Sequence, residues 1–469
     1  MGSLAKWGAW LLGGCVLALG AWFAINATDE ALSDEARATM VLPPLPAPDR
    51  DNGFLDFLVL SAPAGAPTFE TGLEQLAAYN NQSGGELAPP PWGYFKADPR
   101  LRTCTFGGEE GGSGDARGCF QAAREPWVPA ALEAQAAFLG RYRAMRDKPR
   151  FVNIISAKSP ENSLPAYVEP LEAQRLVLLG AARRFQAGDR LGAVREVERD
   201  AAFYRRMALD ATTLIDKMIA FAALDRVALF VTELARHGPR GDAALWRELE
   251  AVVRALTRQE LDVMPSLRRA VADHVRWMQT RQYVRLSDAS WETLRWSGKT
   301  RPWWDPLAPY LYRPHQTVNR CAARYGILAA VAERPPTEYF DAAKAARARA
   351  QALDPGLVQG LIVNPAGLRH PLNGECEVLD YIGRMHGRAA VQTLARLQVN
   401  LRARGITGPQ DIEAQLAGPL GAAHANPFSG QPMRYDASTR TLGFDVEQRY
   451  LSGAVYVLYQ RYGRMALPL

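Results

Sequence analysis

The sequence lacks the charge runs and the motifs that mark many nucleic-acid-binding proteins and enzymes. Lys and Arg total 55 against 49 Asp and Glu, and no run of five or more like charges occurs. Basic and acidic residues are interleaved along helical segments, which is typical of solvated helix faces, so we expect no nucleic-acid partner. Past the first 25 residues there is no HExxH, GxSxG, Walker or Ser-x-x-Lys motif, so the sequence names no catalytic residue and no cofactor.

Cysteine is scarce, with five in 469 residues. Cys15 lies in the apolar N-terminal run, and the others are Cys104, Cys119, Cys321 and Cys376. None has the CxxC spacing of a zinc or redox site. Three pairings of these four are possible, and Cys104–Cys119 with Cys321–Cys376 is the most economical. An even number of cysteines in an exported chain predicts structural disulfides.

Only one long hydrophobic run is present. Trp7–Ile25 contains 19 residues without a charge, and at about 1.5 Å per residue such a helix nearly spans a bilayer core of about 30 Å. Lys6 precedes the run and acidic residues follow it, so residues 1–6 are predicted to stay in the cytoplasm. We therefore predict a transmembrane anchor at residues 7–25 in the inner membrane, with the bulk of the chain in the periplasm.

Two other interpretations of the N-terminal run remain open. A cleaved signal peptide requires a shorter apolar core and a small-x-small cleavage site, of which Ala21–Ala27 offers a weak example. A lipoprotein signal would use Cys15, but the residues after it, Val16–Ile25, stay apolar instead of turning polar. An uncleaved anchor agrees best with both observations.

The rest of the chain divides by composition into four stretches. A Pro-rich linker, 26–50, contains Val41-Leu-Pro-Pro-Leu-Pro-Ala-Pro48 and is predicted to be a semi-rigid spacer. Residues 51–165 are rich in Pro, Gly and Asn and are interpreted as a loop-rich capping region with a disulfide. Helical periodicity dominates residues 166–353, the predicted core domain. Residues 354–469 form a C-terminal module.

The periodicity predicts a mainly α fold, either a helical bundle or an irregular αα-hairpin solenoid. Segments 171–186 and 191–209 flank Gly188-Asp189 and indicate an αα-hairpin. Segment 213–235 is apolar on most faces, which favours a central position in the core. Near the C-terminus, Arg434–Asp436 and Thr441–Phe444 flank a turn at Ala437–Arg440 and predict a small β-hairpin.

Two groups of charged residues have both structural and functional interpretations. The first lies on the apolar segment 213–235, where internal ion pairs are favoured over a polar functional pocket because an unpaired buried charge is costly. The second lies in a glycine-rich loop whose acidic spacing differs from that of calcium loops, so we predict no metal site. The first group is Asp216, Lys217, Asp225 and Arg226, and the second is Glu109, Glu110 and Asp115.

An unusual density of aromatic residues lies between residues 291 and 312. Aromatic faces stack on sugars, bind apolar groups of a partner or rest at a membrane interface. A loop that packs its aromatics onto the helical body is the structural alternative. The candidate binding residues are Trp291, Trp296, Trp303, Trp304, Tyr310 and Tyr312.

Four segments resemble landmarks of an uncharacterised proteobacterial family of single-pass, periplasmic helical proteins. The resemblance covers roughly residues 170–445, and it departs from the family's Pro-Asn-x-Thr-x-Asn pattern at His315. It implies a topology and a compartment but carries no catalytic residue. The segments are Leu214-Ile-Asp-Lys-Met-Ile-Ala220, Arg313-Pro-His-Gln-Thr-Val-Asn-Arg320, Asn364-Pro-Ala-Gly367 and Asn426-Pro-Phe-Ser-Gly-Gln-Pro-Met-Arg-Tyr435.

These observations predict a membrane-anchored periplasmic binding or scaffold protein of the cell envelope, with an envelope protein as its partner. The alternative is a hydrolase acting on envelope polymers or peptides, which requires a deep cleft with convergent Asp, Glu or His. A third hypothesis is a purely structural envelope protein, which requires the tryptophans of the aromatic stretch to be fully buried.

Overall fold

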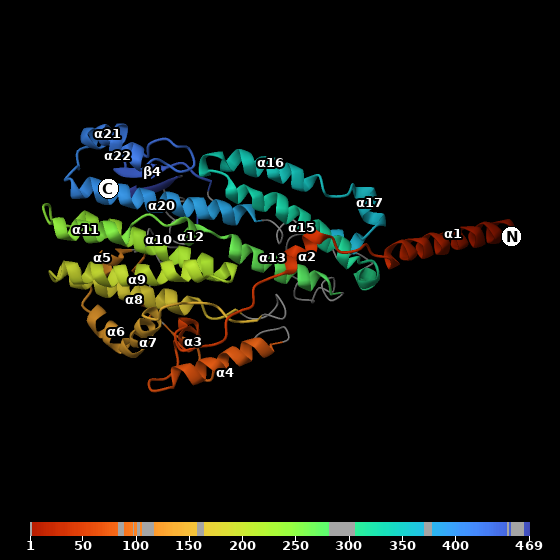
Figure 1. Ribbon diagram of the computed structural model, residues 1–469, viewed down its shortest axis with the longest axis horizontal. Helices are drawn as coiled ribbons and strands as arrows, with labels where there is room; N and C mark the ends of the chain where they lie inside the picture. The colour runs from red at the N-terminus through yellow and green to blue at the C-terminus, as the bar shows by residue number, and fades with distance from the viewer. Residues whose placement is uncertain are drawn as a thin grey trace. The chain divides into compact units, whose positions relative to one another are not determined.

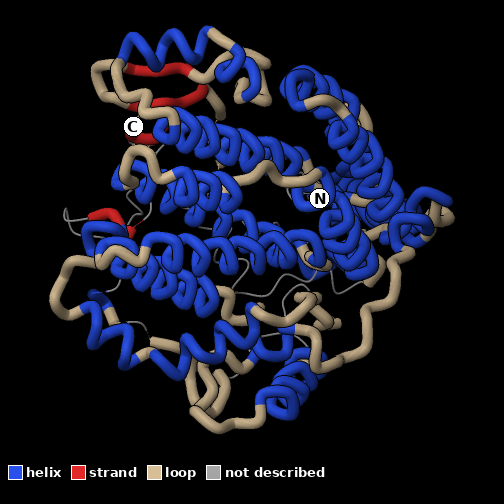
Figure 2. Tube along the Cα trace, turned by 60° about the vertical axis from the view of Figure 1, so that its left-hand side comes forward, coloured by secondary structure: helices blue, strands red, loops and turns tan. Residues whose placement is uncertain are grey.

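The fold is mainly α-helical, as predicted. The computed structural model describes residues 2–82, 89–96, 98–100, 104–105, 117–156, 164–280, 305–369, 378–447, 450–451 and 464–469. Within these ranges helices prevail and strands are few and short (Figure 2).

Two compact units are each assembled from three separate stretches of chain. Unit 1 comprises Met1–Pro43, Arg268–Arg334 and Phe340–Leu379. Unit 2 comprises Pro44–Leu267, Pro335–Tyr339 and Asp380–Leu469. Within unit 1, the N-terminal residues therefore pack with segments more than 200 positions away in the sequence.

Unit 2 is built around the predicted αα-hairpin and the helix that follows it. Helices α8 and α9 are joined at Gly188, whose φ of +99° suits a glycine, and the Asp189 side chain caps α9 by accepting from Gly192 N at 3.0 Å. Helix α10 follows the N-cap Thr213 and packs on α9, and these helices lie side by side with α11 (Figure 1). The bounds are α8 (Val168–Gln186), α9 (Arg190–Asp210), α10 (Leu214–His237) and α11 (Ala243–Val252).

Three charged residues of α10, Asp216, Lys217 and Asp225, are buried and are satisfied in different ways, while the half-buried Arg226 donates to the Leu171 carbonyl at 3.1 Å. Asp225 forms the predicted kind of internal ion pair, with Arg388 of α20 (Leu379–Ala403) at 2.8 Å. Asp216 instead accepts hydrogen bonds from the hydroxyls of Tyr167 and Thr213, both at 2.5 Å. Lys217 donates from Nζ to the Ala208 carbonyl at 2.6 Å. Burial raises the pKa of Asp216 and lowers that of Lys217 to about 8.

Short helices form the described part of residues 51–165. Helix α4 (Thr68–Asn81) packs on α3 (Gly53–Leu58). Gly72 permits this packing, because a Cβ there would stand 2.8 Å from the Leu55 carbonyl oxygen. Two further helices, α6 (Val128–Ala134) and α7 (Ala136–Arg146), are divided at Gln135.

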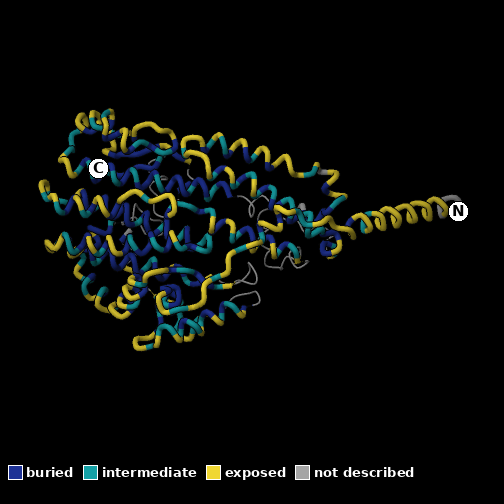
Figure 3. Tube along the Cα trace, viewed as in Figure 1, coloured by how far each residue is buried: buried dark blue, intermediate teal, exposed yellow. Residues whose placement is uncertain are grey.

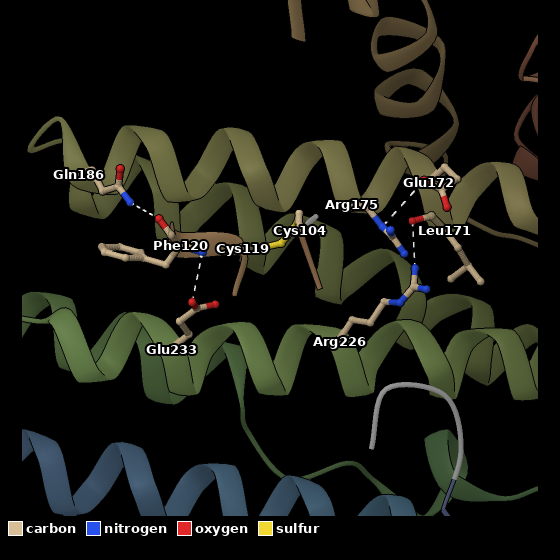
Figure 4. The surroundings of a disulfide bond; sticks show 9 residues. All are labelled: Cys104, Cys119, Phe120, Leu171, Glu172, Arg175, Gln186, Arg226 and Glu233. Atoms are coloured by element: carbon tan, nitrogen blue, oxygen red, sulfur yellow. Dashed lines mark hydrogen bonds and ion pairs between the residues drawn. A yellow bond between two sulfur atoms is a disulfide. The ribbon is translucent and has the colours of Figure 1, made fainter. Parts of the chain in front are cut away.

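The Cys104–Cys119 disulfide is present, as predicted. Cys119 begins α5 (Cys119–Ala122), which lies between α8 and α10 in Figure 4. From α8, Gln186 donates to the Phe120 carbonyl, and from α10, Glu233 accepts from Phe120 N at 3.2 Å. The disulfide therefore fastens a segment that bridges two core helices of unit 2.

The predicted β-hairpin is confirmed and is extended by a third strand. β3 (Arg434–Asp436) pairs antiparallel with β4 (Thr441–Phe444), and β4 pairs antiparallel with β5 (Met465–Pro468). From α20, Gln398 donates to the Pro468 carbonyl at 2.8 Å, which attaches the sheet to the helices. A two-residue parallel pair, β1 (Cys104–Thr105) with β2 (Arg117–Gly118), lies at the disulfide. The remaining helices of unit 2 include α12 (Arg258–Leu261), α21 (Pro409–Ala417) and α22 (Pro419–Ala423).

Unit 1 contains the N-terminal helix and the helices that hold its C-terminal end. Helix α15 begins at Pro314, because proline suits the first helical position. The elements are α1 (Gly2–Ala27), α2 (Asp34–Met40), most of α13 (Met264–Met278), η3 (Asp305–Tyr310), α15 (Pro314–Ala329), η4 (Ala330–Glu333), most of α16 (Tyr339–Gln351), α17 (Leu357–Ile362) and α18 (Pro365–Arg369).

Candidate functional site

Helix α1 is apolar on all sides, and its residues 6–21 are exposed. Lys6–Ala27 is 22 residues long with a mean hydropathy of 1.8, which is long and apolar enough to cross a membrane. Most of α1 is coloured as exposed in Figure 3, and Trp10 is 79% and Leu17 76% exposed. Apolar surface of this extent is unfavourable in water and is stabilised by contact with lipid.

The last turn of α1 is hydrogen-bonded to unit 1. The side-chain amide of Asn26 donates to the Trp22 and Ile362 carbonyls, both at 2.9 Å. The indole N–H of Trp22 donates to the Leu361 carbonyl at 3.1 Å, and the Arg313 guanidinium donates to the Ile25 carbonyl. The end of α1 is therefore fixed by side chains and backbone that are remote in the sequence.

The residues immediately after α1 lie against the start of α15. Arg313, at the N-cap of α15, makes no capping hydrogen bond, and Asp29 takes over this role. The Asp29 carboxylate accepts from His315 N at 2.7 Å and from Gln316 N at 3.2 Å. A carboxylate here satisfies free amide donors and complements the positive end of the helix dipole.

Two side chains of α15 continue this contact toward α2. His315 Nδ1 lies 2.8 Å from the Glu30 carbonyl oxygen. Asn319 donates to the Glu30 carboxylate at 2.7 Å and to the Ala31 carbonyl at 2.9 Å, and its oxygen accepts from Ser33 N at 2.8 Å.

Asn364 connects the two sides of this contact. It is fully buried, and its φ of 56° lies in the left-handed region. Its side-chain oxygen accepts from Arg313 N at 2.9 Å and Gly367 N at 3.1 Å, and its amide donates to Thr317 Oγ1 at 2.9 Å. Its own N–H donates to the side-chain oxygen of Asn26 at 2.7 Å. We call residues 26–33, 313–319 and 361–367 together the clasp.

The segment after the clasp follows α13 within unit 1. Arg268 donates to the Ala38 and Val41 carbonyls at 3.3 and 3.4 Å, and Arg269 donates to the Pro43 carbonyl at 3.0 Å. The first part of the predicted Pro-rich spacer thus lies against helices of unit 1 rather than extending freely.

Two of the four family-like segments, 313–320 and 364–367, contribute to the clasp. The other two lie in unit 2. The segment 214–220 begins α10 and contains the buried Asp216 and Lys217. The segment 426–435 forms a turn in which Asn426 accepts from Phe428 N at 3.0 Å and leads into β3. The sequence patterns did not predict that the clasp residues lie together, because these residues are distant from one another in the chain.

The predicted aromatic site is described only at its C-terminal end. Trp291, Trp296, Trp303 and Trp304 lie outside the described residues. Tyr310 is 60% exposed in η3, an element that contacts α1. Tyr312 is buried, its hydroxyl donates to the Met278 carbonyl at 2.5 Å, and burial raises its pKa. Tyr312 is therefore not available at the surface, whereas Tyr310 is exposed.

The second predicted disulfide is only partly described. Cys321 is buried in α15 and is disulfide-bonded. Its predicted partner, Cys376, lies outside the described residues, so that pairing stays a prediction. The acidic glycine-rich loop with Glu109, Glu110 and Asp115 also lies outside the described residues. Among the residues that are described, no group of three His, Cys, Asp or Glu could hold a metal ion.

A small recess in unit 2 contains a buried carboxylate. Glu169 accepts from Phe95 N at 2.7 Å, and burial raises its pKa. Tyr79 and Tyr94 line the same recess. Its volume of about 20 Å³ is enough for about one water molecule, so its size favours a bound water over a substrate.

Comparisons with known proteins assign the chain to no family: no family model matches it, and no curated protein or solved structure matches it. The likeness to a proteobacterial family therefore stays an expectation from the sequence.

Proposed function

We propose that this protein is a membrane-anchored scaffold or binding component of the cell envelope, with its body in the periplasm and its anchor in the inner membrane. The clasp carries this proposal. It joins the exposed apolar helix to unit 1 through Asn26, Asp29 and Asn364, so that the anchor sets the orientation of unit 1 relative to the bilayer.

A fixed orientation suits a scaffold more than it suits an enzyme that only needs to stay near the membrane. A flexible linker is sufficient to concentrate an enzyme at a surface, because its effective concentration depends on linker length and stiffness. Presenting one face to an envelope partner requires instead that the anchor and the body move together. Residues 28–43, which follow α1, form hydrogen bonds with α15 at Ser33 and with α13 at Pro43. These bonds support an anchor and a body that move together.

The disulfide supports the compartment in this proposal. Cys104 and Cys119 are joined, and structural disulfides persist in oxidising compartments such as the bacterial periplasm. The acidic residues after α1 and the single Lys6 before it agree with export of the body.

Crosslinking in intact cells tests the proposal. A photo-crosslinking residue would replace Trp303, in the predicted aromatic stretch, and a control would replace Lys344, an exposed residue of α16 in unit 1. After gentle detergent extraction, we expect one reproducible envelope protein crosslinked from position 303 and none from position 344. Equal recovery of many proteins from both positions would contradict a specific scaffold role, and the purified full-length protein would then be assayed for hydrolysis of envelope polymers and peptides.

A further inference from the structure

We infer that α17 and Tyr310 form a second membrane contact, which lies in the interfacial layer of the bilayer beside the end of α1. This inference rests on the proposed membrane anchoring and specifies how unit 1 meets the lipid. The contact consists of four exposed apolar side chains, named here the foot patch: Val358 at 71%, Tyr310 at 60%, Leu361 at 55% and Ile362 at 43% exposure.

The composition of this stretch suits lipid. No Asp, Glu, Lys or Arg occurs between Asp354 and Arg369, so 14 successive residues are uncharged. Exposed aliphatic side chains on a short helix are unfavourable in water by about 25 cal/mol per Å². In an interfacial helix the same side chains insert about 5–10 Å into the boundary between headgroups and acyl chains. Tyr310 adds a ring of the kind that gathers at membrane interfaces.

The hydrogen bonds at the end of α1 fix the depth of the foot patch. Trp22 donates to the Leu361 carbonyl and Asn26 to the Ile362 carbonyl, at 3.1 and 2.9 Å. Both donors belong to the last turns of the candidate membrane span, which ends at Ala27. Groups in direct contact with that end lie within about one helical turn, 5.4 Å, of its depth. If α1 spans the bilayer, α17 therefore lies in the headgroup layer, which is about 5–7 Å thick on each side.

Continuity with α1 selects lipid as the occupant of this surface. The foot patch and the apolar surface of α1 meet at Trp22 and Asn26, and the patch is uncharged. A second copy of the chain that covers the patch is an alternative, and the experiment below distinguishes it from lipid.

Depth-dependent quenching tests the inference on the full-length chain. Val358→Cys and Leu361→Cys would each be made in a Cys15→Ser background and labelled with a fluorescent maleimide. The proteins would be reconstituted into phosphatidylethanolamine/phosphatidylglycerol vesicles that contain lipids with a nitroxide at a shallow or at a deep acyl position. Native Cys15, in the middle of α1, reports on the bilayer core. Ala348→Cys, at an exposed position of α16 in the same unit, reports on the aqueous side.

We expect the shallow nitroxide to quench positions 358 and 361 about twofold more than the deep one, since interfacial side chains lie near the headgroups. Cys15 should be quenched more by the deep nitroxide, and position 348 by neither. Quenching at Cys15 without quenching at 358 and 361 would overturn the foot patch while leaving the anchor intact. Absence of quenching at Cys15 would reject the anchor and with it the proposed function. Crosslinking between copies at position 358, with no lipid quenching there, would assign the patch to a second copy and also overturn the inference.

Discussion

At the scale of single residues, Asn364 combines two properties that few other residue types combine. It adopts a positive φ, which asparagine tolerates better than most residues, and its side chain binds two backbone donors and one hydroxyl. The sequence shows only that Asn364 precedes a proline. The partners of Asn364 lie about 50 and 340 positions away, at Arg313 and Asn26, and these contacts follow from the tertiary structure.

Replacing Asn364 by Ala should lower the free energy of unfolding by about 2–4 kcal/mol. The change leaves buried amide donors of Arg313 and Gly367 without an acceptor, at about 1–3 kcal/mol each, and it retains a left-handed backbone that alanine disfavours. Chemical unfolding of the purified protein in detergent measures the loss. Asn400→Ala is the matched control, because Asn400 is half-buried and hydrogen-bonds Arg396 and Glu250 on a helix surface. An equal effect of the two changes would contradict the importance of the clasp.

His386 predicts a pH dependence of stability. It is buried beside the rings of Tyr339 and Phe428, and burial lowers its pKa to about 4. In the unfolded chain its pKa is about 6.5, so the unfolded state binds the proton first as the pH falls. The contribution of neutral His386 to the free energy of unfolding is fully present above pH 6.5. It is lost as the pH falls from 6.5 to 4, by up to about 3 kcal/mol.

Unfolding measured between pH 7.5 and 4.5 checks this dependence. The natural protein should lose stability over this interval, and His386→Gln should lose less, because glutamine does not titrate. Identical slopes for the two proteins would show that the pH dependence arises from other groups.

At the scale of elements, the N-terminus of α15 is capped by a residue from a different part of the chain. Asp29 precedes Pro314 by 285 residues, yet its carboxylate accepts hydrogen bonds from the first amides of α15. A Ser, Thr, Asp or Asn next to the helix normally has this role. Proline at the first turn indicates the start of α15 from the sequence. The identity of its cap does not follow from local rules, since these consider only neighbouring residues.

Replacing Asp29 by Ala should loosen the contact between residues 28–33 and α15. Loss of an N-cap costs about 0.5–2 kcal/mol, and here it also releases the chain that follows α1. Hydrogen exchange of the amides of residues 315 and 316 should become faster in the variant. Asp34→Ala is the control, because the Asp34 side chain is fully exposed and pairs only with Arg37 at 3.3 Å. Unchanged exchange at 315 and 316 in Asp29→Ala would contradict the capping role.

At the scale of the whole molecule, a disulfide adds a covalent constraint to the unfolded chain. The Cys104–Cys119 disulfide spans 15 positions in unit 2, and such a loop contributes roughly 3 kcal/mol by restricting the unfolded chain. Replacing both cysteines by Ser should therefore lower the free energy of unfolding by about 3 kcal/mol. Cys15→Ser, which removes the exposed free thiol, should leave it unchanged. Equal unfolding midpoints in denaturant for the double variant and the natural protein would contradict this role.

Features that depend on local sequence patterns could be predicted from the residues alone. The apolar run Trp7–Ile25 predicted α1, period-3.6 segments around Gly188 predicted α8 and α9, and the turn at 437–440 predicted β3 and β4. These patterns are visible because helix and hairpin formation depend on residues within a few positions of one another. Spacing and compartment likewise suggested the Cys104–Cys119 disulfide.

Contacts between segments that are distant in the sequence could not be predicted and are known from the structure. β5 pairs with β4 across about 20 residues, and the clasp gathers residues near positions 29, 315 and 364. Periodicity contains no information on such pairings, because the hydrogen bonds that satisfy a buried group depend on which elements pack together. The division into two units, each assembled from three stretches, has the same origin: local sequence specifies the helices, and the burial of their apolar faces determines their neighbours.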